Sequence, residues 1–217
     1  MFVETLRRIS SISTRHCGKI YTPEGLTHLL RMQFRDPQLQ FETRRHSRVA
    51  RGNFWIGGEY RCIDDEQDEP CITITLTYPK SEKFCEIDQM DWHHLAFHLA
   101  DVITHEYLHQ WYSRQRGYRN GPGYRERTNL YYGESMQDYL GCEDEIQAHA
   151  FNVCSEMIVY NRNMEQTKTY RLYQRHFQDD PKVVIKLKKQ VRKYIKRWEQ
   201  SNEQVDPRSK RNNRRCV

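Results

Sequence analysis

The stretch Val102-Ile-Thr-His-Glu-Tyr-Leu-His-Gln-Trp111 decides how the surrounding chain folds. It contains no proline and no charged residue except Glu106. Apolar residues recur around it at helical spacing from residue 92 to about residue 112, and Asp88 and Asp91 stand where such a helix would be capped. The sequence therefore predicts a buried helix here.

Two histidines of this helix lie one turn apart. His105 and His109 share one face, so their imidazoles can converge on a single tetrahedral ion while Glu106 projects beside them. A role as ordinary surface residues is disfavoured, because buried histidine and glutamate side chains need partners. His94 and His98 are also four apart, but His98 lies about 10 Å from His105 along a helix, too far to share an ion. We expect His94 and His98 to have surface or supporting roles.

A second helix is predicted from the apolar spacing of Ile146, Ala150, Val153 and Met157. It opens with the acidic run Glu143-Asp144-Glu145, whose carboxylates suit a helix N-terminus. A catalytic zinc needs a third protein ligand and one open position, and this run offers candidates for that ligand.

The segment 102–111 is similar to the extended HExxH signature of zincin metallopeptidases, and Glu145-Ile-Gln-Ala148 resembles the Glu-x-x-Ala pattern of the gluzincin branch. The resemblance implies that His105, His109 and Glu145 bind zinc and that Glu106 is the general base. Because Glu143 and Asp144 lie off the Ala148 pattern, we assign them to helix capping and solvation. The chain departs from thermolysin-type gluzincins at His149, where they carry an aspartate, so the partners of the ligands are in question.

Residues 50–160 as a whole look like small phage-encoded zincin-like proteins. That resemblance implies an α+β fold, the minimal zincin-like domain, with a small antiparallel sheet packed on the HExxH helix and an edge strand that can align an extended peptide. Phe54-Trp55-Ile56 and residues 71–78 are the expected antiparallel strands, and alternation along 72–78 predicts one buried and one polar face. Thr22-Pro23-Glu24 begins a helix expected to end near Asp36-Pro37.

We divide the 217 residues into an N-terminal segment (1–19), a zincin-like metallopeptidase domain (20–165), a basic amphipathic helix region (166–200) and a disordered basic tail (201–217). The formal charge of +6 is concentrated in residues 182–215. A long irregular connection is expected over 113–139.

The predicted function is hydrolysis of a peptide or protein substrate by Zn²⁺ chemistry, with Glu106 taking a proton from the attacking water. A hydrogen-bond donor to the oxyanion of the reaction is also needed, and Tyr131, Tyr132, Tyr139 and His149 are the candidates. The alternative is a non-enzymatic metal-binding or interaction protein that contacts nucleic acid or an acidic partner through residues 182–215. A purely structural metal site has no need of Glu106, which favours the enzyme.

The remaining features favour a soluble protein in the cytoplasm. No apolar stretch approaches the length of a membrane span, and the seven cysteines form no CxxC pair. We therefore expect no membrane partner.

Overall fold

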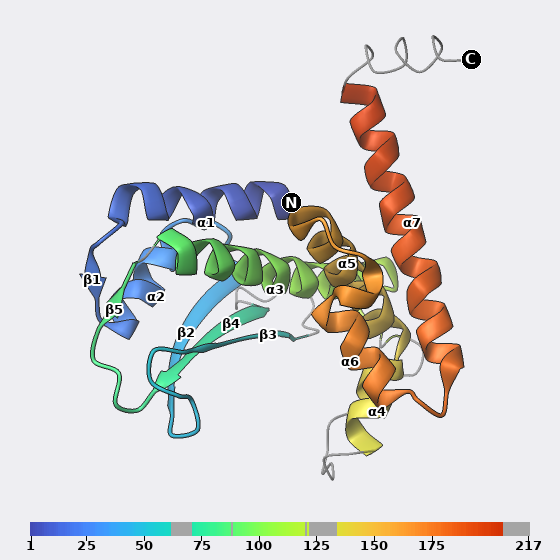
Figure 1. Cartoon of the computed structure of the whole chain (residues 1–217), viewed down its shortest axis with the longest axis horizontal. Coiled ribbons are helices and arrows are strands. Elements are labelled where there is room, and N and C mark those ends of the chain that lie inside the picture. Colours follow the sequence, from blue (N-terminus) through green and yellow to red (C-terminus); the bar gives the residue numbers. More distant parts are fainter. Residues whose placement is uncertain (62–70, 88, 120, 122–133, 206–217) are drawn as a thin grey trace. The chain divides into compact units, whose positions relative to one another are not determined.

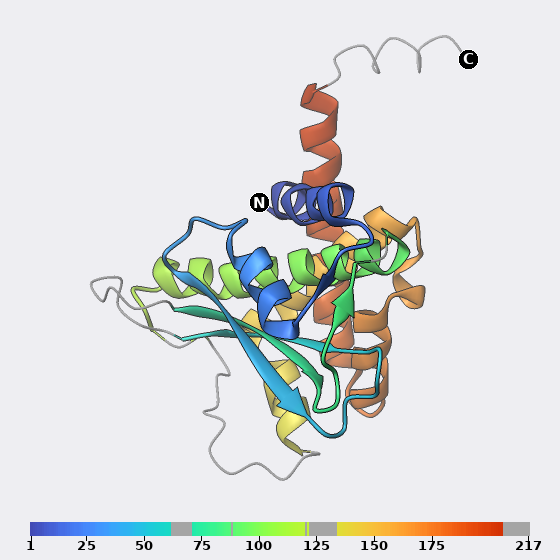
Figure 2. The same cartoon turned by 90° about the vertical axis from the view of Figure 1, so that its left-hand side faces the viewer.

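The computed structural model of the protein describes residues 1–61, 71–87, 89–119, 121 and 134–205 (Figures 1 and 2). These residues form an α+β structure of helices and two small sheets. Their contacts divide the chain into two units, residues 1–120 and 121–217. The division falls inside the predicted domain of residues 20–165, whose boundaries stay a prediction.

The main sheet of the first unit has three strands in the order β2-β4-β3. Strand β3 (Trp55–Tyr60) pairs with β4 (Ile72–Pro79) in antiparallel fashion, as predicted. Strand β2 (Leu39–His46) pairs with the other edge of β4 in parallel. The expectation of an antiparallel sheet is therefore wrong, and the sheet is mixed. Sequence reasoning missed β2 because its second half is charged and exposed, which hides the strand pattern.

Helix α3 (Gln89–Gln115) covers the apolar face of this sheet (Figures 1 and 2). The predicted buried face of β4 is confirmed, since Ile72, Ile74, Leu76 and Tyr78 are all buried, and Thr73 on the other face is buried as well. Helix α1 (Phe2–His16) packs on α3 from the side away from the sheet, which explains why α3 is apolar on more than one face.

Helix α1 lies in the stretch predicted only as an N-terminal segment. The Trp92 indole Nε1 donates to the carbonyl of Ile9 over 2.8 Å and ties α3 to α1. Ile9 and Ile12 are fully buried in the same core, so the segment contributes to the fold.

The remaining elements of the first unit are short. Helix α2 (Pro23–Arg31) begins as predicted, with the Thr22 hydroxyl accepting from the Gly25 amide over 3.1 Å, and ends before the expected Asp36-Pro37. Strands β1 (Ile20–Tyr21) and β5 (Cys85–Glu86) pair in antiparallel fashion.

The second unit is helical where the structure describes it. It contains α4 (Glu134–Gly141), α5 (Glu143–Tyr160), the 3₁₀ turn η1 (Met164–Gln166), α6 (Lys168–His176) and α7 (Pro181–Val205). Its core includes Ile146 and Val153 of α5 and Leu187 and Val191 of α7. The helices predicted around Ile146 and Val184 are thus confirmed. Helix α7 continues past Ser201, where the tail was expected to begin, and residues 206–217 lie outside the described part.

Within the described residues, no helix combines the length and the apolar character that crossing a bilayer requires.

Candidate metal centre

The two predicted imidazole ligands meet on one face of α3. His105 Nε2 and His109 Nε2 are 2.9 Å apart, and the two rings stand edge to face at 73°. Two nitrogens bound to one tetrahedral zinc at about 2.0–2.1 Å lie about 3.3 Å apart. The rings are therefore within a few tenths of an ångström of the separation that a shared ion needs, and His105 is only 8% exposed.

Glu106 lies against the backbone of the edge strand β3. A Cβ atom added to Gly58 would stand 2.4 Å from Glu106 Oε1, a separation that real contacts do not allow. Glycine at this position therefore lets the strand approach the carboxylate closely. Glu106 is 7% exposed, so its carboxylate is held between α3 and β3 and away from bulk solvent.

The second unit presents a carboxylate and an imidazole one turn apart on α5. Glu145 occupies the first turn of the helix and is 6% exposed. Its Oε2 lies 3.7 Å from His149 Nδ1. The same Nδ1 is 3.0 Å from the hydroxyl of Tyr173 on α6, a residue that the sequence did not single out.

The structure describes some of the acidic residues that compete with Glu145 for the ligand role and some of the candidate oxyanion donors. Glu143 is exposed at the start of α5, in keeping with a solvated residue. The Tyr139 ring lies edge to face with the His149 ring at 6.5 Å between centroids. Tyr131 and Tyr132 lie outside the described residues.

The chain offers three side chains that could together hold a metal ion: His105, Glu145 and His149, each with one ligand atom. Two of them were predicted as ligands, while His149 was considered only as an oxyanion donor or as a departure from the gluzincin pattern. Imidazole and carboxylate donors suit several divalent transition metals, zinc among them. The donor set fits a metal ion without fixing its identity.

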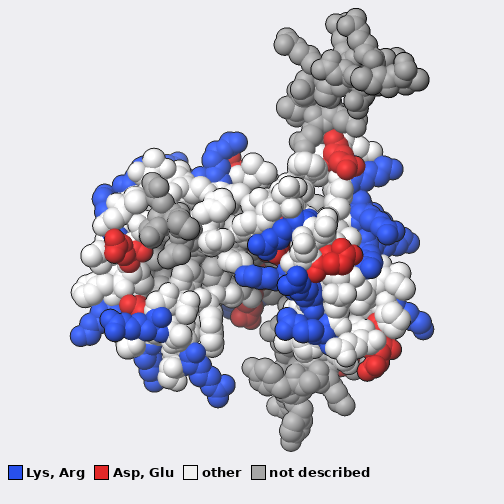
Figure 3. All heavy atoms as spheres, viewed as in Figure 1, with Lys and Arg blue, Asp and Glu red and all other residues white. Residues whose placement is uncertain are grey.

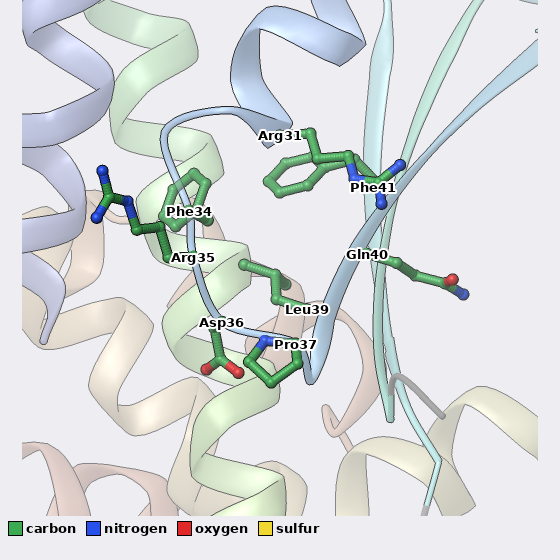
Figure 4. Close-up of a pocket in the computed structure, with 8 residues that line it drawn as sticks. All are labelled: Arg31, Phe34, Arg35, Asp36, Pro37, Leu39, Gln40 and Phe41. Atoms are coloured by element: carbon green, nitrogen blue, oxygen red, sulfur yellow. The ribbon is translucent and has the colours of Figure 1, made fainter. Parts of the chain in front are cut away.

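Other histidines of α3, and a pocket in the first unit, involve none of these three residues. His94 is exposed, and the His98 ring contacts Phe97. A pocket of about 310 Å³ lies at the connection of α2 to β2, lined by residues such as Arg31, Phe34 and Phe41 (Figure 4). None of the predicted ligands lines it.

Comparisons with family models, with curated proteins and with solved structures find no match to this chain. The case for a function therefore rests on the residues themselves.

Sequence reasoning missed Gly58 and Tyr173. A glycine inside a strand signals the close approach of another group, and Gly57-Gly58 carried that signal without showing which glycine mattered. Tyr173 gave no local signal, because its contact with His149 depends on the packing of α6 against α5.

Proposed function

We propose that the protein is a zinc-dependent metallopeptidase that uses His105, His109 and Glu145 as ligands and Glu106 as general base. The observation that carries the proposal is the 2.9 Å separation of the two Nε2 atoms, with the buried Glu106 carboxylate next to them in sequence. Two imidazoles one helical turn apart are a common pair of zinc ligands, and His105 is buried.

Glu145 is the third ligand in this proposal. It is buried in the first turn of α5, and its carboxylate offers a ligand atom to the same donor set as His105. When bound, zinc would supply Lewis acidity toward a substrate carbonyl and toward water. The residues of the chain hold the ion and leave the proton transfers to Glu106.

Glu106 would take the proton of the attacking water and return it to the leaving amine. A general base must be fixed within hydrogen-bond reach of that water. The contact of Glu106 with Gly58 supports this role, because packing against a strand backbone restricts the rotamers of the carboxylate.

The substrate in this proposal is an extended peptide that adds to β3. In the described sheet β3 pairs only with β4, so its other edge can offer backbone groups to a further strand. A peptide paired there would run past Gly58 and hence past Glu106.

Replacing Glu106 with glutamine tests the proposal. E106Q should retain its zinc, because Glu106 is not a ligand, and should lose about 100-fold or more in kcat on a generic peptide library. The control is E143Q, which removes the same charge at an exposed acid of α5 and should keep wild-type turnover. Unchanged turnover in E106Q would contradict the assignment of the base.

The basic face of α7 supports a second candidate function, contact with nucleic acid. Leu187 and Val191 are buried in the core, whereas Lys189 and Lys193, about 200° around the helix from them, are exposed. No acidic residue interrupts α7 before Glu199. Figure 3 shows lysine and arginine side chains gathered along this helix. Such a surface attracts phosphate backbones.

A further inference from the structure

Three helices of the second unit meet through one tyrosine hydroxyl. Tyr173 of α6 lies 3.0 Å from Nδ1 of His149 on α5 and 2.9 Å from the carbonyl oxygen of Leu140 on α4. Tyr173 is fully buried in the core that these helices share. A buried hydroxyl in this place must satisfy its hydrogen bonds through these two neighbours.

The two contacts settle where the protons lie. A phenol has one proton, and a backbone carbonyl can only accept, so the Tyr173 hydroxyl donates to Leu140. The bond to His149 must then run the other way, with Nδ1–H donating to the Tyr173 oxygen. The Glu145 carboxylate, 3.7 Å from the same Nδ1, favours a proton there as well.

Tyr173 is a neutral phenol near neutral pH, because the ordinary pKa of tyrosine is about 10. The hydroxyl therefore stays a donor to Leu140 and an acceptor for His149. Since a neutral imidazole carries one proton, the lone pair of His149 is on Nε2.

We propose that Tyr173 is a positioning residue that holds His149 as the Nδ1–H tautomer, with Nε2 as a metal-ligating nitrogen. The donor set is then His105, Glu145 and His149, which leaves one position open for water, and His149 takes the place of His109 among the proposed ligands. Metal-binding histidines commonly donate their other ring N–H to a neighbouring oxygen, which fixes the tautomer and the ring orientation. The inference rests on the proposed zinc site, and it removes neutral His149 from the candidate oxyanion donors, because Nε2 carries no proton to donate.

The chain provides a matched control on the same helix. Tyr170 is also buried in the core of the second unit, but its ring faces the Lys188 ammonium, 5.4 Å from the ring centroid. Replacement of either tyrosine with phenylalanine removes one buried hydroxyl of α6. Only Y173F removes the acceptor for His149.

The tautomer is measurable in zinc-free protein by NMR of ¹⁵N-labelled histidine side chains. We expect His149 of the wild type, and of Y170F, to be protonated at Nδ1, and we expect Y173F to show a mixture of both tautomers. Protonation of wild-type His149 at Nε2 would overturn the inference. The wild-type measurement holds even if Y173F fails to fold.

Zinc affinity, measured by competition with a chromophoric chelator, is the second readout. Y173F should bind zinc about 10- to 100-fold more weakly, as for other groups that orient a ligand histidine, while Y170F should match the wild type. Circular dichroism would verify that both variants are folded. Wild-type affinity in folded Y173F would overturn the positioning role.

The two proposals fail in different ways. If the protein binds zinc with the expected tautomer and affinities but cleaves no peptide, the peptidase proposal fails and the role of Tyr173 is supported. If it cleaves peptides while His149 is protonated at Nε2, the role of Tyr173 is overturned and the peptidase proposal is supported.

Discussion

At the scale of single residues, the proposed role of Glu106 as general base depends on Gly58, a neighbour that has no side chain. Gly58 and Gly57 follow each other in β3, yet only a Cβ at Gly58 would collide with Glu106, and a Cβ at Gly57 would meet nothing within 4 Å. The two glycines therefore form a natural pair of test positions in one strand.

We expect Gly58→Ala to displace the Glu106 carboxylate and to lower peptidase kcat by about 100-fold, since misplacement by about 1 Å has effects of that size. Gly57→Ala should stay close to wild-type activity. Initial rates on a fluorogenic peptide, with zinc content measured in parallel, would verify that the ion is retained. Equal activity in both variants would show that Glu106 does not depend on the approach of β3.

The same residues mark the limit of sequence-based reasoning about the site. The spacing of His105 and His109 predicted their convergence, because a helix fixes which residues share a face. The contacts of Gly58 with Glu106 and of Tyr173 with His149 join residues of different elements. No local pattern specifies such contacts, since they arise only when strands and helices pack.

At the scale of elements, hydrophobic periodicity and helix-capping residues predicted part of the secondary structure. Helices α2, α3, α5 and α7 and the pair β3–β4 follow from apolar spacing and from Thr22 at the start of α2. Helix α1 and strand β2 were missed, because basic residues mask their buried faces. The parallel pairing of β2 with β4 depends on tertiary context and could not be read from either strand alone.

Helix α7 is the element proposed to contact nucleic acid. The double variant Lys189→Ala, Lys193→Ala should weaken binding to a labelled DNA duplex. A plot of log K against log salt concentration has a negative slope for such binding. The variant should make that slope shallower by about one for each phosphate that it no longer neutralises. Fluorescence anisotropy across a salt titration measures both quantities.

A matched control for charge is the pair Lys80→Ala, Lys83→Ala. Both lysines are exposed in the first unit, between β4 and β5, and their removal changes the net charge equally. The control should retain the wild-type slope. A weakening of binding as large as that in the α7 variant would mean that net charge, and not this helix face, carries the interaction.

At the scale of the whole molecule, the proposed ligands are distant in sequence. In the proposed site, His105 and His109 belong to residues 1–120 and Glu145 belongs to residues 121–217. A metal that binds only the folded protein stabilises it in proportion to the logarithm of the metal concentration over Kd. Zinc would therefore matter for stability as well as for catalysis.

The most direct test of the account is the metal content of purified protein and of two histidine variants of α3. We expect about one zinc per chain in the wild type and its loss in His105→Ala. His94→Ala, which changes an exposed histidine of the same helix, should keep the zinc. A wild type without zinc, or stoichiometric zinc in folded His105→Ala, would contradict the metal centre and with it the proposed peptidase.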